Sequence, residues 1–232
     1  MYDWHWQVIG LYKTVFLQGA LVTLGLTLFT VVLGTAAGAA LAFLKQSRNL
    51  VFSFSAKAYI ELFRALPILV VLIWIFYVVP ILFDWRISAF LAAGIALSLH
   101  LSAFVAETVR AGIESVQRHQ MESALALGMT QAQAMRRIIL PQAVRNMVPN
   151  LLGLYINELK NSSLASIIAV NELLHRANIL ISQTFRPLEI YTAVAVMYLV
   201  IILPLVYLAR LYERRVSRGS QSAFHLEYEA GA

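Results

Sequence analysis

The sequence predicts an all-α polytopic membrane protein with five transmembrane helices. Of the 232 residues, 60% are hydrophobic and 13% are charged, whereas soluble chains average about 45–50% and about 25%. The charged residues lie in clusters between long uncharged runs, which is the pattern of helical membrane proteins. A water-soluble globular protein is therefore excluded.

Uncharged runs locate the individual spans, since a helix needs about 20 apolar residues to cross the hydrocarbon core. Four runs meet this length or come close to it, and a fifth apolar stretch is interrupted only by Glu158 and Lys160. We expect Pro67 and Pro204 to kink their helices. With their helical flanks, the predicted spans cover residues 15–44, 60–83, 87–109, 147–171 and 189–210.

Basic residues between the spans set the orientation. Twelve of them follow spans one and five or lie between spans three and four, whereas four lie on the opposite side. The positive-inside rule therefore predicts an outer N-terminus and a cytoplasmic C-terminus. The net charge of +6 then reflects orientation and attraction to anionic membrane lipid, and it does not indicate a nucleic-acid partner.

The cytoplasmic loop between spans three and four is too long and too organised for a simple connection. Its sequence predicts a helix that stops at Gly128, followed by a second helix that starts with a capping box of Thr130 and Gln133 and ends at Pro141. Apolar Ala124, Leu125 and Leu127 are exposed on this elbow unless a partner covers them. The elbow is either a docking surface or a helix that lies on the lipid.

The same loop carries a motif that resembles a known family. Glu122, Ser123, Ala124, Gly128, Ile138, Leu140 and Pro141 match the EAA motif, E-A-A-x3-G-x9-I-x-L-P, of the membrane subunits of ABC importers, with Ser123 as the single departure. Further segments resemble the polar amino acid permease branch, the type related to histidine, glutamine, arginine and glutamate importers. They begin at Gln18, Tyr59, Ala106 and Asn157, and the resemblance covers about residues 15–212.

The resemblance implies a division into parts and a set of partners. Residues 15–212 would form an ABC transmembrane type-1 domain in the bacterial cytoplasmic (inner) membrane, after an outer interfacial segment at 1–14 and before a cytoplasmic tail at 213–232. The motif residues would dock a cytoplasmic ABC ATPase homodimer. An identical or homologous permease and an extracytoplasmic amino-acid-binding protein would complete the importer, the latter touching residues 171–189.

The ATP that drives transport is expected to bind to a partner subunit. None of the 11 glycines is followed by Lys, so the chain has no G-x4-G-K-[ST] phosphate loop. ATP and magnesium are therefore expected on the ATPase subunit, and this chain is expected to be no enzyme. It has no Cys, and its five His have no metal-ligand spacing, so we expect no metal or cofactor site here.

Polar residues of the fourth span are candidates for the substrate path, because such residues are costly in a membrane. Glu158 and Lys160 point about 200° apart on an intact helix. The polar run of Asn157, Asn161, Ser162 and Ser163 indicates a local break. We expect Lys160 to suit an α-carboxylate and Glu158 an α-ammonium group or a gating ion pair. The alternative is a permanent bridge to charges on spans two or three.

Span three adds Ser98, His100 and Ser102 to the predicted path, where His100 either contacts substrate or is an interhelical histidine. At the cytoplasmic ends of spans two and three, Glu61 with Arg64 and Glu107 with Arg110 are spaced i, i+3. We expect these four charges to form an inner gate. The alternative is that they are surface pairs at the headgroup level.

Small residues recur along span one at Thr30, Gly34, Gly38 and Ala42 and predict close packing. The stripe faces either another helix of the chain or a second permease. The overall prediction is a permease subunit of an importer for polar amino acids, driven by a separate ATPase. The alternatives are a stand-alone ion-coupled amino acid carrier, which would have matched broken helices in two repeats, and an intramembrane enzyme, for which the sequence shows no nucleophile with its base.

Overall fold

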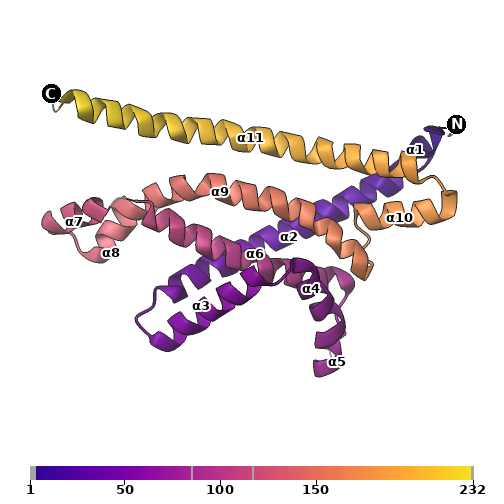
Figure 1. Cartoon of the computed structure of the whole chain (residues 1–232), viewed down its shortest axis with the longest axis horizontal. Helices are drawn as coiled ribbons and strands as arrows, with labels where there is room; N and C mark the ends of the chain where they lie inside the picture. The colour runs from indigo at the N-terminus through magenta and orange to yellow at the C-terminus, as the bar shows by residue number, and fades with distance from the viewer. Residues whose placement is uncertain (1–3, 85, 117, 231–232) are drawn as a thin grey trace.

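The computed structural model describes residues 4–84, 86–116 and 118–230, and the regular structure of these residues is helical throughout. Residues 1–3 of the predicted outer segment and 231–232 of the predicted tail lie outside the described residues. The long helices follow the longest axis of the molecule, with the N-terminus at one end and the C-terminus at the other (Figure 1).

The first span consists of short α1 (Gln7–Leu11) and α2 (Lys13–Lys45), a helix of 33 residues. At about 1.5 Å per residue, α2 is longer than the roughly 30 Å hydrocarbon core. It packs along α6 (Ala89–Glu114), where Gly34 lies against Leu101 and Gly38 against Val105. The small-residue stripe therefore faces a helix of the same chain, which was one of the two alternatives.

The second span is divided into two parts. α3 (Leu50–Ala65) is followed at an angle of 106° by α4 (Ile68–Ile73), the π-helical η1 (Trp74–Val78) and α5 (Val79–Phe83). Leu66 is extended because the residue before a proline avoids the helical conformation, and Pro67 has no N–H to donate. The expected kink at Pro67 is present, and the predicted span 60–83 is not one straight helix.

After α6, the chain forms α7 (Arg118–Ala126) and a second helical segment. This segment comprises α8 (Gln131–Ala134), the π-helical η2 (Met135–Ile139) and α9 (Leu140–Asn161). Our expectation that Pro141 ends the helix was wrong, because the helix continues into α9. The N–H of Leu140 donates to the carbonyl of Met135, five residues back, and this wider turn accommodates the proline ring that follows.

The fourth span changes its helix type within the predicted polar run. α9 ends at Asn161 and passes into a 3-10 helix, η3 (Ser162–Ile168). A bend of 46° then leads to α10 (Leu173–Thr184). α11 (Pro187–Ala230) returns along the molecule as one helix that includes Pro204 (Figure 1).

Three helical segments in the described part of the chain are long and apolar enough to cross a membrane: Lys13–Lys45, Ala89–Glu114 and Pro187–Arg214. Two bent pairs meet the same criterion together, so the number rises to five if each pair is one span. Their outward faces carry many exposed apolar side chains, including Leu17, Leu21, Leu28 and Val32 of α2. Such surfaces require lipid or partner helices.

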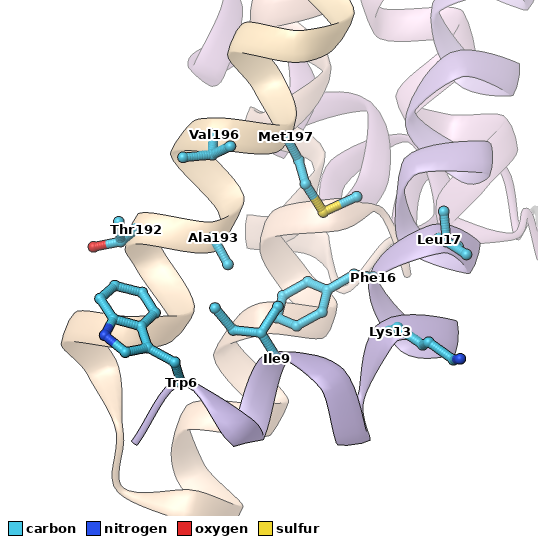
Figure 2. Close-up of a pocket in the computed structure, with 9 residues that line it drawn as sticks. All are labelled: Trp6, Ile9, Lys13, Phe16, Leu17, Thr192, Ala193, Val196 and Met197. Atoms are coloured by element: carbon cyan, nitrogen blue, oxygen red, sulfur yellow. The ribbon is translucent and has the colours of Figure 1, made fainter. Parts of the chain in front are cut away.

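An apolar groove of about 350 Å³ lies where the N-terminal helices meet α11 (Figure 2). Phe16 and Ile9 point toward Met197 and Ala193, while Lys13 extends away at the edge. The groove is lined by Trp6, Ile9, Lys13, Phe16, Leu17, Thr192, Ala193, Val196 and Met197. It forms part of the apolar surface of the membrane domain near the N-terminal end.

Candidate functional site

A cavity of about 260 Å³ between α6 and α9 brings together residues from the third and fourth predicted spans. Three of its residues, His100, Asn157 and Glu158, were predicted from sequence to lie on the path. The full lining is His100, Leu101, Phe104, Leu154, Asn157, Glu158 and Asn161. Polar groups from two helices thus face one small space within an apolar bundle.

Glu158 is the acidic residue of this lining. It is only 2% exposed, and its Oε1 atom has no hydrogen-bond partner among the described residues. The side chain of Asn161, one turn further along the helix, lines the same cavity. Because an ionisable side chain inside a membrane is costly, a buried carboxyl oxygen without a partner makes Glu158 a candidate for contact with a ligand.

Lys160 does not line the cavity. α9 remains a regular helix through Asn161, so Glu158 and Lys160 point to different sides, Glu158 buried and Lys160 exposed. The break predicted near these residues begins only after Lys160, at η3. Glu158 and Lys160, both predicted from the sequence to lie on the substrate path, therefore lie on different sides of α9.

The four predicted path serines also lie outside the cavity lining. Ser162 and Ser163 donate to the carbonyls of Leu159 and Lys160 at 2.7 and 2.8 Å. Ser102 donates to the Leu99 carbonyl at 2.7 Å and pairs with the Tyr59 hydroxyl at 2.9 Å. Ser98 is 8% exposed, and its hydroxyl has no partner among the described residues.

Sequence reasoning did not assign two polar or aromatic residues of this lining to the substrate path. Asn161, considered only as a helix breaker, lines the cavity together with Phe104. The ring of Phe104 lies 5.0 Å from the ring of His100, and the Arg64 guanidinium carbon lies 5.8 Å from the centroid of Phe104. The i, i+4 spacing of His100 with Phe104, and of Asn157 with Asn161, is the signal that places each pair on one helix face.

The predicted gate residues belong to two different environments. Glu107 accepts from Arg110 and also from Lys45 of α2, the latter at 3.1 Å, and Arg110 further pairs with Glu114. Glu61 and Arg64, both exposed near the end of α3, form no ion pair with each other in the described part of the chain. Glu107 and Arg110 thus tie α6 to α2, whereas Arg64 lies on Phe104.

The predicted elbow of the cytoplasmic loop has the expected local geometry. Gly128 has φ of +82°, the left-handed conformation that favours glycine. The Thr130 hydroxyl accepts from the Gln133 N–H at 3.3 Å, and the Gln133 side chain accepts from the Thr130 N–H at 2.9 Å, so the capping box is confirmed. The motif therefore builds a rigid helix–turn–helix corner.

The motif residues divide into buried and exposed members. Ala124 is 1% exposed, so the expectation that it is exposed was wrong, because the elbow folds back and covers it. Leu125 and Leu127 are exposed, as are Glu122, Ser123 and Pro141, while Ile138 and Leu140 are half-buried. A hollow of about 500 Å³ nearby is lined by Ala132, Gln133, Arg136 and Arg137.

The predicted outer segment 171–189 contains α10, and two of its acidic residues are buried. Glu172 caps α10 by accepting from the N–H groups of Leu174 and His175 at 2.9 and 2.6 Å, and from the Tyr198 hydroxyl at 3.2 Å. Glu189 accepts from the His5 N–H at 3.0 Å and lies 3.7 Å from Arg186. These acids hold the fold and are not available to a partner.

Known proteins resemble this chain in both sequence and fold. A family described as "Binding-protein-dependent transport system inner membrane component" matches residues 30–218. The chain belongs to this family. It is 34% identical to "Glutamine transport system permease protein GlnP" of Escherichia coli (strain K12), over 93% of this chain and 98% of that protein.

Two further similarities extend this finding. "Probable amino-acid ABC transporter permease protein PatM" of Vibrio harveyi is 43% identical over 62% of this chain and 65% of that protein. A chain from the crystal structure of an amino acid ABC transporter with histidines has a TM-score of 0.88 and 38% identity, covering 92% of this chain and all of that chain. The protein is thus a multi-pass permease component of the bacterial inner membrane, and its elbow is the coupling helix of this family.

Proposed function

We propose that this permease moves polar amino acids into the cytoplasm as the membrane subunit of an ATP-driven importer. The observation that carries the proposal is the α6–α9 cavity, whose amide, imidazole and carboxylate groups match the hydrogen-bonding groups of an amino acid. The similarity to amino acid permeases over nearly the whole chain supports the same substrate class.

The proposed topology has five spans, in which each bent helix pair counts as one. The N-terminus and α10 lie outside, and the elbow and C-terminal tail lie in the cytoplasm, as the positive-inside rule favours. Residues 1–14 form the outer interfacial segment, 15–212 the transmembrane domain and 213–232 the tail.

The orientation can be tested by thiol labelling. Because the chain has no Cys, Ser182→Cys and Glu213→Cys each introduce a single thiol into it. An impermeant thiol reagent is expected to label the first from outside and the second from inside, and the reverse pattern would exclude this orientation.

Energy is proposed to come from a cytoplasmic ABC ATPase homodimer that binds ATP and magnesium, since this chain has no phosphate loop. Glu122, Leu125 and Leu127 form the exposed side of the elbow that the ATPase covers. Arg136 and Arg137 flank it with positive charge. An extracytoplasmic amino-acid-binding protein delivers the substrate to the α10 end.

A second permease subunit, identical or homologous, is proposed to complete the translocation path. Lys160 is exposed on the side of α9 away from the cavity, where such a subunit can reach it. Glu107 and Arg110, tied to Lys45, form the inner gate near the cytoplasmic ends of α2 and α6. Glu61 and Arg64 extend this gate from α3.

The test is transport by purified protein in liposomes. The permease, its ATPase and its binding protein are expected to accumulate polar amino acids only when ATP is present on the ATPase side. Uptake that proceeds without the ATPase and follows an imposed proton or sodium gradient would support the alternative, a stand-alone ion-coupled carrier. An ATPase variant that cannot hydrolyse ATP serves as the control.

A further inference from the structure

The apolar groove between the N-terminal helices and α11 opens on the membrane-facing surface of the bundle (Figure 2). Leu17 of α2 and Val196 of α11 line it and are 58% and 51% exposed, whereas Phe16 in the same lining is buried. Both helices belong to segments that are long and apolar enough to cross a membrane. The groove is therefore covered by lipid or by another protein when the chain is in its membrane.

The groove lies at the end of the first span, near the level of the lipid headgroups. α2 has 33 residues and begins at Lys13, so at about 1.5 Å per residue it is about 20 Å longer than the hydrocarbon core. Trp6 lines the groove, and its ring is stacked on that of Trp4 with 5.1 Å between the centroids. Tryptophan is enriched at the membrane–water interface, which supports this placement.

Lys13 gives the groove a positive charge at its edge. Figure 2 shows Lys13 and Trp6 on opposite sides of the groove, with Ile9 and Phe16 between them. The Lys13 side chain is exposed and forms no ion pair with any described residue. A lysine at this level covers apolar surface with its stem and keeps its ammonium group among the headgroups. The edge of the groove thus offers a cation to an anionic headgroup.

We propose that this groove binds an anionic phospholipid, with one acyl chain between α2 and α11 and the phosphate on Lys13. The volume of about 350 Å³ lies within the range of about 300–1,000 Å³ that is typical of ligand sites. The indole N–H of Trp6 supplies a second donor for a phosphate or ester oxygen. Because lipid tails are as apolar as the groove, the choice among lipids rests on the charge of Lys13.

A second copy of this chain fits the groove less well. In a two-fold symmetric contact the same patch of each copy faces the other. A contact centred on this groove would therefore bring the two Lys13 side chains together, and like charges across an interface are unfavourable. A phosphate satisfies the charge that a second copy would oppose.

The test counts lipids that stay on the purified permease–ATPase complex. The complex is stripped of lipid, mixed with phosphatidylglycerol or with phosphatidylcholine of the same acyl chains, and examined by native mass spectrometry. Phosphatidylglycerol is expected to be retained at concentrations about fivefold lower than phosphatidylcholine. This factor corresponds to one basic residue acting on an anionic headgroup.

Two pairs of variants assign the retained lipid to the groove. Lys13→Gln is expected to weaken retention of phosphatidylglycerol about fivefold, whereas Lys57→Gln removes an exposed lysine of α3 and is expected to behave like wild type. Val196→Trp fills the groove and is expected to remove one lipid per copy of this chain. Val200→Trp, the same exchange one turn further along α11 at an exposed position outside the lining, is its control.

The possible results either support or overturn the proposal. Equal retention of the two lipids by wild type, or equal losses in Lys13→Gln and Lys57→Gln, would overturn the anionic site. Efficient disulfide cross-linking of Val196→Cys between two copies would overturn it as well, because the groove would then be a contact between permeases. Gel filtration with the ATPase shows that each variant assembles. Because Lys13 is exposed, Lys13→Gln keeps the test decisive even if Val196→Trp does not fold.

Discussion

Gly38 of α2 lies so close to Val105 of α6 that a Cβ atom at position 38 would be 2.6 Å from the Cβ of Val105. The same Cβ would lie 2.6 Å from the carbonyl oxygen of Ser102. Neither of these atoms is the flexible end of a side chain, so the helices must separate to admit even a methyl group. Glycine at this position therefore sets the distance between α2 and the helix that carries His100.

The exchange Gly38→Ala is expected to lower the stability of the purified protein by about 1–3 kcal/mol, the usual cost of overpacking a tight contact. The loss of stability is measured as a decrease in the melting temperature of the permease in detergent. Gly25→Ala is the control, because Gly25 is an exposed helical glycine with open space around its Cβ position. Equal melting temperatures for Gly38→Ala and wild type would show that α2 and α6 are not in such close contact.

The coupling elbow depends on the left-handed conformation of Gly128. No atom lies within 4 Å of a Cβ built there, so a substitution is opposed by the backbone alone. Gly128→Val is expected to reorient α7 and weaken coupling between ATP hydrolysis and uptake, because branched residues do not tolerate φ near +82°. Gly128→Asn is the matched variant, since Asn tolerates this conformation, and it should retain coupling. Transport per ATP hydrolysed is the measurement, and full coupling in Gly128→Val would contradict a rigid elbow.

A substitution in the proposed inner gate is expected to change the regulation of ATP hydrolysis. Glu107 holds both Lys45 and Arg110, so Glu107→Gln leaves two cations without their shared partner. We expect the cytoplasmic ends of α2 and α6 to loosen and ATP hydrolysis to become less dependent on the loaded binding protein. Glu114→Gln removes only the more exposed partner of Arg110 and serves as the control. Unchanged ATPase regulation in Glu107→Gln would mean that these charges form a surface cluster with no gating role.

The buried cap of α10 gives a local prediction. Glu172→Ala removes the acceptor for the Leu174 and His175 N–H groups, and loss of such a cap costs about 0.5–2 kcal/mol. Hydrogen exchange of the first turn of α10 is expected to become faster, because its amide protons lose their partner. Thr184→Ala, at the other end of α10, leaves this cap intact. Unchanged exchange in Glu172→Ala would show that α10 is held without its cap.

Short-range features of the fold were predictable from the sequence. Uncharged runs locate α2, α6 and α11, because the bilayer imposes a length and composition on each span. Gly128 and the Thr130–Gln133 capping box also follow from neighbours in the chain. Pro141 was misread because the π-helical turn before it admits a proline ring, and nothing in local composition marks such a turn.

The candidate site was predictable only in part, since it depends on which helix faces meet. Spacing shows that Glu158 and Lys160 diverge, but only the packing of α6 shows that Glu158 faces the cavity. Glu172 and Glu189 resembled surface charges in a polar segment, yet both cap or bridge buried groups. Pairing of a charge with distant backbone groups leaves no local pattern in the sequence.

The central claim, that the substrate path runs through the α6–α9 cavity, is tested most directly by thiol labelling of Asn157→Cys in this chain, which otherwise has no Cys, within the assembled complex. An added polar amino acid that the complex transports is predicted to slow labelling of this cavity residue and to leave labelling of Ser182→Cys on α10 unchanged. If no amino acid at saturating concentration protects Asn157→Cys in a complex that still transports, the path lies elsewhere and the account is contradicted.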